Sequence, residues 1–294
     1  MEQIASLQIL LSALVLSSVY VLVALGLNLV YGTMRLLNVA HGDLMMLGGY
    51  VAYWSFILLG IGTLGSMFGA AALCALLGFI LYQALLRRFL SNSKFAERLE
   101  SNSMIIFFGL SIIAQNLMSL AFSADPRSYS YMNAIVELGP VRVEATRLVV
   151  LGVGVAAATA CVLFFRYSRL GLAARALIQQ KDAAALVGID ANQINLIVFC
   201  LGFGLAGLAG ALVSMTEAIT PFGGFQYTIA AFVIIILGGL GNIWGGIIGG
   251  VFLAFIEIYG SALTSTAYRS IIVYGVFVAV LCLRPQGILG KRIA

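Results

Sequence analysis

The sequence predicts an all-α polytopic membrane protein with eight or nine transmembrane helices in a single domain over residues 1–294. Two observations predict this fold class. The chain is 62% hydrophobic and 9% charged, with a mean hydropathy of +1.08, whereas soluble domains carry roughly 25% charged residues. Its apolar runs are also continuous and longer than the roughly ten alternating residues of a transmembrane barrel strand, which indicates helices.

Individual spans follow from the length of these runs, since a helix needs about 20 apolar residues to cross the hydrocarbon core. We expect spans near residues 9–33, 43–60, 63–86, 103–122, 148–166, 194–215, 226–242, 245–262 and 269–284. The first run is too long for the apolar region of a signal peptide, so we expect it to be retained. The seventh and eighth runs are short and nearly continuous, which leaves the count between eight and nine.

The basic residues predict the orientation of these spans. Alternating spans put 12 of the 16 Lys and Arg residues on one face, which is the cytoplasmic face by the positive-inside rule. These are Arg35, Arg87, Arg88, Lys94, Arg98, Arg166, Arg169, Arg175, Lys181, Arg284, Lys291 and Arg292. The N-terminus is then outside and the C-terminus cytoplasmic. Because the net charge of +5 lies in short loops, it does not indicate nucleic-acid binding.

An internal repeat is predicted from two similar glycine-rich segments. A shift of 176 residues aligns Gly62–Ala70 with Gly238–Gly246 in the pattern Gly-x-Leu-Gly-polar-apolar-aromatic-Gly-small. The predicted topology places the first segment outside and the second inside, so the halves, about 18–95 and 194–271, should run in opposite directions. Coincidence among Gly-rich helices remains the alternative. The glycines expected to pack helices closely are Gly62, Gly65, Gly69, Gly238, Gly241 and Gly245.

Polar residues just inside the first span form the segment Asn38-Val39-Ala40-His41-Gly42-Asp43. One interpretation is a capped helix start, in which Asn38 or Asp43 accepts backbone N–H bonds. The other is a cytoplasmic gate or part of the solute path, because polar groups at membrane depth tend to line cavities. His41 is the only histidine and the four cysteines are far apart, so we expect neither a metal site nor a cofactor.

Glu257 is the other candidate for the solute path, because it lies deep in an apolar run. A carboxylate there costs about 2.5–3.5 kcal/mol on insertion scales and should face the bundle interior or water. It could equally form a structural hydrogen bond between helices. We expect the path itself to be mostly apolar, with Glu257 as its only deeply placed ionisable group. Asn28, Gln115 and Asn116 are neutral candidates for the same interior.

The loop at residues 166–192 is Ala-rich and mildly amphipathic, which predicts a helix too polar to span the membrane. Gly188 is placed to end that helix. With acidic as well as basic charges, the loop fits a protein partner better than lipid. Since the sequence has no Gly-x-x-x-x-Gly-Lys-Ser/Thr run, any ATP-driven motor must be another chain. The coupling residues we expect are Arg169, Arg175, Ala176, Lys181, Asp182, Gly188 and Ile189.

Three of these segments resemble the permeases of branched-chain amino acid ABC transporters. Residues 36–43 with the following Gly48-Gly49-Tyr50 are similar to the "NFAHG" segment of that family, although Val39 and Asp43 replace its usual Phe and Glu. The loop from Arg175 to Ile189 resembles its ATPase-coupling motif. Residues 238–257 resemble its glycine-rich region.

The resemblance implies a non-enzymatic transport subunit of a bacterial inner membrane. It also implies a second, homologous permease, two cytoplasmic ABC ATPases and an extracytoplasmic solute-binding protein. Related permeases for urea or short amides remain an alternative. A secondary transporter using Glu257 as a proton or sodium site, or a membrane channel or structural protein, would leave the predicted surface helix without a role.

Overall fold

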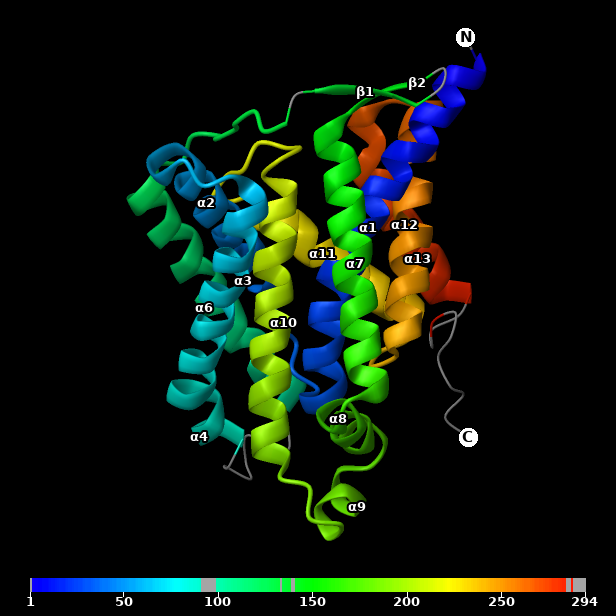
Figure 1. Ribbon diagram of the computed structural model, residues 1–294. Coiled ribbons are helices and arrows are strands. Elements are labelled where there is room, and N and C mark those ends of the chain that lie inside the picture. Colours follow the sequence, from blue (N-terminus) through cyan, green and yellow to red (C-terminus); the bar gives the residue numbers. More distant parts are fainter. Residues whose placement is uncertain (1, 91–98, 133, 139–140, 284–286, 288–294) are drawn as a thin grey trace.

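The computed structural model describes residues 2–90, 99–132, 134–138, 141–283 and 287. Its long helices lie side by side as one bundle, with the N-terminus at one end (Figure 1). They are α1 (Glu2–Met34), α2 (His41–Leu59), α3 (Thr63–Leu81), α6 (Leu99–Phe122), α7 (Ala145–Tyr167), α10 (Ala191–Val213), α11 (Gly224–Gly238), α12 (Ile243–Leu263) and α13 (Arg269–Leu283). The shorter elements are η1 (Tyr82–Leu86), α4 (Arg87–Leu90), β1 (Ile135–Leu138), β2 (Val141–Glu144), α8 (Arg169–Gln179), α9 (Lys181–Leu186) and η2 (Thr266–Tyr268).

Among the described residues, seven helices are long and apolar enough to cross a membrane. They are Leu7–Met34, His41–Leu59, Thr63–Leu90, Leu99–Phe122, Ala145–Tyr167, Ala191–Val213 and Ile243–Leu263. Helix α11 has only 15 residues, about 22 Å at 1.5 Å per residue, which is shorter than the hydrocarbon core of about 30 Å. The short span expected at 226–242 is therefore shorter still in the structure, because the helix ends at Gly238. Helix α13 is equally short, and the part of its expected span beyond residue 283 is not described.

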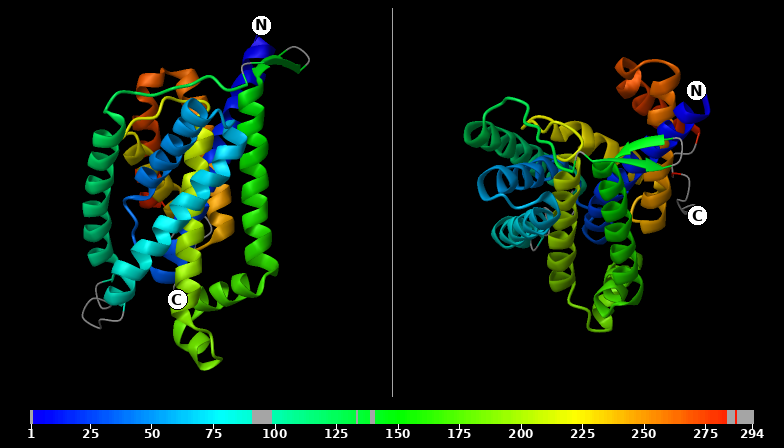
Figure 2. Two further views of the ribbon diagram at one scale, coloured as in Figure 1. Left: turned by 60° about the vertical axis from the view of Figure 1, so that its left-hand side comes forward. Right: turned by 45° about the horizontal axis from the view of Figure 1, so that its top comes forward.

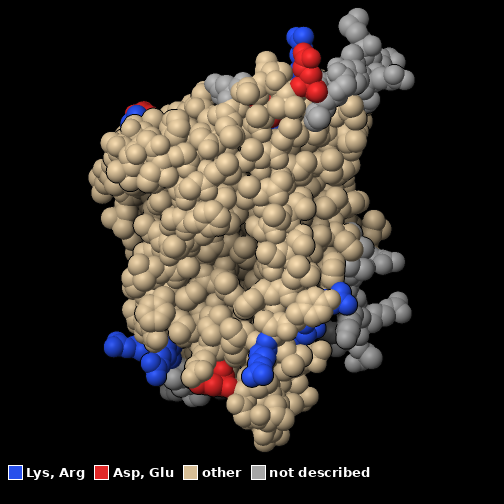
Figure 3. All heavy atoms as spheres, in the orientation of Figure 1, with Lys and Arg blue, Asp and Glu red and all other residues tan. Residues whose placement is uncertain are grey.

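Charged side chains are confined to the two ends of the surface that Figure 3 shows. On the face shown in Figure 3, Lys, Arg, Asp and Glu lie at the two ends of the bundle, and an uncharged belt separates them. That distribution fits a protein surrounded by lipid at mid-height. The end opposite the N-terminus carries α4, α8 and α9, so the loops predicted to be cytoplasmic share one end of the bundle (Figure 1).

Helices α1, α2 and α10 form the centre of the bundle, whereas α6 and α7 lie at its periphery (Figure 2). From Val19 to Val30 every residue of α1 is buried. Helix α6 instead exposes a row of large apolar side chains, among them Ile105, Ile113 and Leu120. The exposed apolar surface of α6 is expected to contact lipid or another membrane protein. The buried helices α1 and α10 form the core around which the site is built.

Helix α2 begins inside the bundle instead of at its end. Arg35 has a φ of 53° and turns the chain back after α1 ends at Met34. The ring of His41 then lies beside Val23, with 3.0 Å between His41 Nε2 and the Val23 carbonyl oxygen. Eleven residues of helix separate Val23 from Met34, about 16 Å along the axis. Residues 35–40 therefore re-enter the bundle to roughly half its depth, and α2 runs from there to the N-terminal end.

The two segments α1–α3 and α10–α12 pack crosswise. The most extensive helix contacts join α3 to α10 and α12 to α1. Where α1 crosses α10, a Cβ built on Gly26 would lie 2.8 Å from the Gly202 oxygen, and a Cβ on Gly202 the same distance from the Gly26 oxygen. A Cβ on Gly42 of α2 would lie 1.9 Å from the oxygen of Gly224 in α11. Matching helices of the two segments therefore meet each other at glycines.

The end of the bundle that holds the N-terminus is covered by extended chain. Strands β1 and β2 form an antiparallel hairpin in which Val136 pairs with Val143. Arg127 forms a two-way backbone bridge with Ile219, in the connection between α10 and α11. That bridge fixes the connection from which α11 descends into the bundle.

Candidate solute path and coupling surface

The starts of α2 and α11 meet at one buried junction. The Gly42 amide donates a hydrogen bond of 2.8 Å to Thr228 Oγ1, and Thr228 Oγ1 donates one of 3.1 Å to the Val39 carbonyl oxygen. His41 is fully buried and contacts α1 through Val23. The segment around Gly42 thus contacts both α1 and α11, which explains why it combines small and polar residues.

Asp43 is bound by neutral donors of α6. Its side chain is 1% exposed and accepts hydrogen bonds from Ser111 Oγ at 2.5 Å and from Gln115 Nε2 at 3.0 Å. Within the described ranges no Lys, Arg or His forms an ion pair with it. The expectation that Glu257 is the only deeply placed ionisable residue is therefore wrong, since Asp43 and His41 are buried as well.

The capping interpretation of this segment is also wrong. Ala40 occupies the N-cap position of α2, and no side chain caps the helix. Asn38 is fully buried, and both polar atoms of its amide lack a hydrogen-bond partner within the described residues, as does His41 Nδ1. A buried, unpaired amide costs about 1–3 kcal/mol, so Asn38 is the residue of this segment whose polarity the protein's own contacts leave unexplained.

Asn28 has a structural role. Its Nδ2 donates to the Asn242 carbonyl oxygen at 2.7 Å, and its Oδ1 accepts from the Gly241 amide at 2.8 Å. Both contacts lie in the turn between α11 and α12, where Gly241 has a φ of 78°. Asn28 therefore joins α1 to that turn. Asn116, by contrast, is exposed on α6 and bonds only its own helix at Ile112, so its expected interior position is wrong.

Glu257 lies in the interior, as expected, and its two oxygens are both paired. Tyr20 Oη donates to Glu257 Oε2 at 2.7 Å, and the Arg269 guanidinium forms an ion pair with Oε1. Glu257 is 1% exposed, whereas the Arg269 side chain is 42% exposed. Sequence reasoning missed both partners, because Tyr20 is 237 residues away and Arg269 lies 12 residues away in the next long helix.

The glycine-rich segments differ in how tightly they pack. Gly238 and Gly245 approach so closely that a Cβ on Gly245 would lie 1.9 Å from the Gly238 oxygen. In the first segment a Cβ on Gly62 would meet the hydroxyl of Tyr131 at 2.8 Å, and one on Gly65 would meet only Ile61 of the preceding turn at 3.2 Å. A Cβ on Gly69 would meet nothing within 4 Å. The close helix packing expected of Gly62, Gly65 and Gly69 is therefore wrong.

The predicted surface helix consists of two helices, α8 and α9, separated at Gln180, whose φ is −160°. Ser168 caps α8, with its Oγ accepting from the Gly171 amide at 2.9 Å. Gly188 follows α9 with a φ of 84° and donates its amide to Ala185, so its predicted role as a stop is confirmed. The break at Gln180 allows α9 to turn away from α8.

Helix α8 lies against the bundle and α9 projects from it (Figure 1). Ala174 and Leu177 are buried, and Arg175 Nη2 donates to the Arg166 carbonyl oxygen at 3.0 Å. At the tip, Leu186 is 89% exposed and Val187 is 76% exposed. Arg169, Lys181, Asp182 and Gly188 are exposed, whereas Arg175, Ala176 and Ile189 are half-buried. An apolar tip flanked by charges, held beyond the end of the bundle, is suited to docking on another protein.

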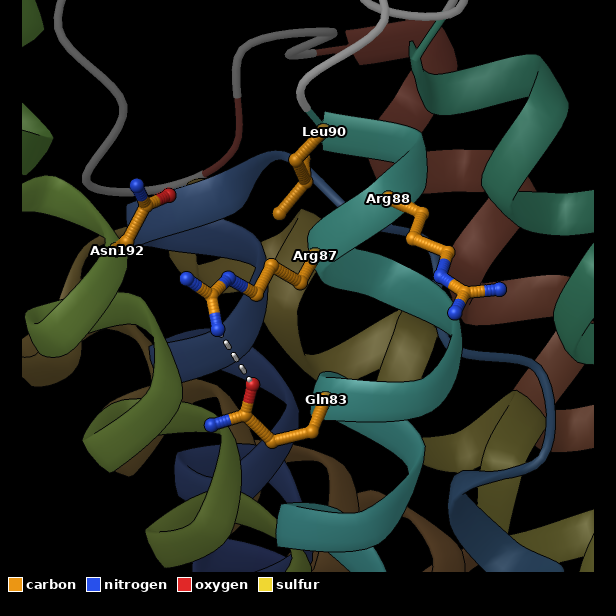
Figure 4. Close-up of a pocket in the computed structure, with 5 residues that line it drawn as sticks. All are labelled: Gln83, Arg87, Arg88, Leu90 and Asn192. Atoms are coloured by element: carbon orange, nitrogen blue, oxygen red, sulfur yellow. Dashed lines mark hydrogen bonds between the residues drawn. The ribbon is translucent and has the colours of Figure 1, made fainter.

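A basic pocket lies at the same end of the bundle, between α4 and the start of α10. Gln83, Arg87 and Asn192 face one another across it, while Arg88 leaves the other side of α4 (Figure 4). Arg87 Nη1 donates to Gln83 Oε1 at 3.3 Å. The pocket adds positive charge to the end that carries α8 and α9.

Comparison with known proteins agrees with these features. A profile of the family described as "Branched-chain amino acid transport system / permease component" matches residues 9–281. The chain is 31% identical to the high-affinity branched-chain amino acid transport system permease protein LivH of Escherichia coli K12, over 97% of this chain and 96% of the relative. It is 29% identical to BraD of Pseudomonas aeruginosa, described in the same words, with the same coverage.

A second kind of permease is also similar. The chain is 26% identical to the high-affinity branched-chain amino acid transport system permease protein LivM of E. coli K12, over 93% of this chain and 68% of the relative. No solved structure matches the chain with statistical significance.

Proposed function

Because this chain belongs to the family of branched-chain amino acid transport system permease components, we propose that it is the membrane-spanning subunit of an ATP-driven importer of branched-chain or related neutral amino acids. The observation that carries the ATP-driven part is the α8–α9 unit. A chain without an ATP-binding motif presents an exposed apolar tip beyond its bundle. A separate ATPase docked there would transmit its motion through α8 into the bundle.

The contacts of α8 support this coupling role. Ala174 and Leu177 are buried in a cluster with Leu29 of α1 and Val198 of α10. A movement of α9 would therefore be transmitted to α1 and α10 through the packed side chains of this cluster, which also includes Ala184 of α9. Lys181 and Asp182 beside the tip would give the docking interface its charge specificity.

The partners of the proposed importer are a second, homologous permease, two cytoplasmic ABC ATPases and an extracytoplasmic solute-binding protein. The similarity to both LivH and LivM of one organism supports a pair of related permeases. We propose a bacterial inner-membrane location with the N-terminus outside and the C-terminus cytoplasmic. The orientation rests on the Lys and Arg residues near α4, α8 and α9, at one end of the bundle.

We further propose that the chain is built from two inverted halves, about residues 18–95 and 194–271. The crosswise packing of α3 on α10 and α12 on α1, together with the Gly26–Gly202 and Gly42–Gly224 contacts, is what a two-fold axis through the bundle would produce. Helices α2 and α11 start inside the bundle and run to opposite ends (Figure 1). Discontinuous helices that meet near mid-membrane are typical of the solute sites of repeat-built transporters.

Within this arrangement we assign Asn38, His41 and Asp43 to the gate region at the α2–α11 junction. Asn38 is the best candidate for a group that contacts solute, because its amide is unpaired in the described part of the chain. Asn28 acts on the path indirectly by positioning helices, and Glu257 joins α1 and α12 to Arg269 of α13. The pairing of Glu257 with Arg269 weakens the alternative of an ion-coupled transporter, since a carboxylate already neutralised by an arginine is a poor carrier for a proton or sodium ion.

The test replaces Leu186 with Glu at the tip and Ile135 with Glu in the outer hairpin as a control, since both side chains are largely exposed. The chain is purified with the subunits it retains, reconstituted in vesicles, and assayed for leucine uptake with and without ATP. We expect Leu186→Glu to lose ATPase subunits and uptake, whereas Ile135→Glu keeps both. Uptake that needs an ion gradient but no ATP would contradict the proposal.

A further inference from the structure

A polar pocket opens among α1, α11, α12 and α13, beside the α2–α11 junction, since its Tyr227 adjoins Thr228. It is lined by Tyr20, Gln226, Tyr227, Glu257, Arg269 and Ser270, together with apolar side chains of α11 and α13. Glu257 lies six residues before the end of α12 at Leu263, about 9 Å along the helix axis. The pocket therefore belongs to the half of the bundle that holds the N-terminus, which is the outer half in the proposed orientation.

Glu257 and Arg269 line the pocket, and the further carboxylate of Glu217 lies beside it. Glu257 is paired with Tyr20 and Arg269, and Tyr227 Oη donates to Glu217 Oε2 at 2.7 Å. Glu217 is exposed at the start of the α10–α11 connection and is joined to the pocket by its bond to Tyr227. The ion pair joins Arg269 Nε to Glu257 Oε1. Since a guanidinium carries five N–H donors in a planar fork, it can bind a second carboxylate beside Glu257.

The exposed polar side chains at the mouth of the pocket distinguish it from the apolar, lipid-facing surface. Gln226 and Ser270 are exposed, and Arg269 is 42% exposed, on helices whose neighbouring exposed residues are apolar, such as Phe225 and Ile271. Charged and amide side chains directed at hydrocarbon are costly, and in membrane proteins they face water or a protein interior. The exposed polar side of α11 and α13 therefore faces a water-filled space or the path between subunits.

We propose that this pocket is the outer part of the solute path and that it binds the zwitterionic head group of an amino acid. Arg269 holds the α-carboxylate, and Glu217 holds the α-ammonium. This inference rests on the proposed function and names the chemistry of its substrate. It departs from the mostly apolar path expected from the sequence. Because Glu257 already neutralises Arg269, binding is weak, which suits a site that passes solute onward.

The experiment measures water access and solute protection in the full-length chain in nanodiscs, with native cysteines replaced. Single cysteines are placed at Gln226 and Ser270, and at Ile271 as the matched lipid-facing control, which is 64% exposed. A charged, membrane-impermeant thiol reagent should label Gln226→Cys and Ser270→Cys at least about tenfold faster than Ile271→Cys, since a thiolate and a charged reagent avoid hydrocarbon. Equal labelling at all three positions overturns the water-filled pocket.

Protection by solute tests the head-group site. L-Leucine should slow labelling at Ser270→Cys, whereas leucinol, which lacks the carboxylate, should not. Adding Arg269→Gln should abolish the protection, and Arg269→Lys should retain part of it. Because Arg269→Gln leaves Glu257 unpaired, the double variant Glu257→Gln/Arg269→Gln serves as a second, better-folded test.

Protection that persists without Arg269, or equal protection by leucinol, overturns the role of Arg269. These outcomes are independent of ATP-driven uptake, so they are distinguishable from a failure of the proposed function.

Discussion

At the scale of single residues, the buried polar groups of this protein differ in what they bind. Asp43 accepts hydrogen bonds from neutral donors of α6, and Glu257 pairs with a tyrosine and an arginine. Asn28 forms hydrogen bonds with backbone groups. All three are nearly fully buried. Their hydrogen bonds join helices that are distant in sequence, so removing one partner should affect a particular pair of helices and not the whole bundle.

Replacing Asp43 tests whether the loss of one partner affects only the packing of α2 against α6, a helix at the periphery of the bundle. Asp43→Ala removes the acceptor for Ser111 and Gln115 and leaves the buried Ser111 hydroxyl without that acceptor, at a cost of about 1–3 kcal/mol, whereas Gln115 Nε2 keeps its bond to Ser111 Oγ. We expect faster backbone hydrogen exchange in α6 with little change in α7, which does not contact Asp43. Asp43→Asn keeps one acceptor oxygen and should lie between the two. Uniform exchange changes over both helices would argue against a local clamp.

Replacing Glu257 tests the ion pair with Arg269. Breaking a fully buried pair costs about 3–5 kcal/mol, but the Arg269 side chain is 42% exposed, so solvent reduces the loss to about 1–2 kcal/mol for Glu257→Gln. The double variant Glu257→Gln/Arg269→Gln should recover part of that stability, because no charge is then left unpaired. Thermal unfolding of the single and double variants measures the coupling. Strictly additive effects would show that the pair contributes no interaction.

At the scale of elements, glycine decides where the helices can touch. Helices α2 and α11 begin against each other at Gly42 and Gly224, and no Cβ fits at either position, since a Cβ on Gly224 would lie 2.6 Å from the Gly42 oxygen. In the first glycine-rich segment a Cβ on Gly62 would meet the side chain of Tyr131 and not a helix backbone, and one on Gly69 would meet no described atom within 4 Å. Similar glycine patterns in the two segments therefore have different structural consequences.

Two alanine substitutions distinguish a glycine at a close helix contact from a glycine beside open space. Gly42→Ala forces the α2 and α11 starts apart and should destabilise the protein by about 1–3 kcal/mol or more through overpacking. Gly69→Ala places its methyl group in open space within α3, and should stabilise the helix by about 0.5–1 kcal/mol. Unfolding of both variants in detergent gives the comparison. A Gly42→Ala variant as stable as Gly69→Ala would disprove the close contact.

At the scale of the whole molecule, the proposed inverted halves can be tested by labelling from the two sides of the membrane. Within the two glycine-rich segments, the polar residues Ser66 and Asn242 are unsuitable for labelling, because Ser66 is buried and Asn242 caps α12. We therefore place single cysteines at Ile61 and Leu240, which are 45% and 49% exposed. In sealed, right-side-out vesicles an impermeant reagent should label Ile61→Cys, and Leu240→Cys only after the vesicles are opened. Labelling of both positions from one side would refute the inverted arrangement.

The sequence by itself determined that this protein spans a membrane and which segments are apolar helices. It also identified the permease family through the segment at Asn38–Asp43 and the loop ending at Gly188. These are local properties, because hydropathy over about 20 residues and a short motif are contained in one window of the chain.

Only the tertiary structure decided that α11 is short, that α2 and α11 begin against each other inside the bundle, and that Glu257 binds Tyr20 and Arg269. It also decided that Gly238 packs tightly where Gly69 does not. The physical reason is that a hydrogen bond or a close contact depends on which distant residues the packing brings together. Tyr20 and Glu257 are 237 residues apart, and no local pattern in a single sequence encodes that pairing.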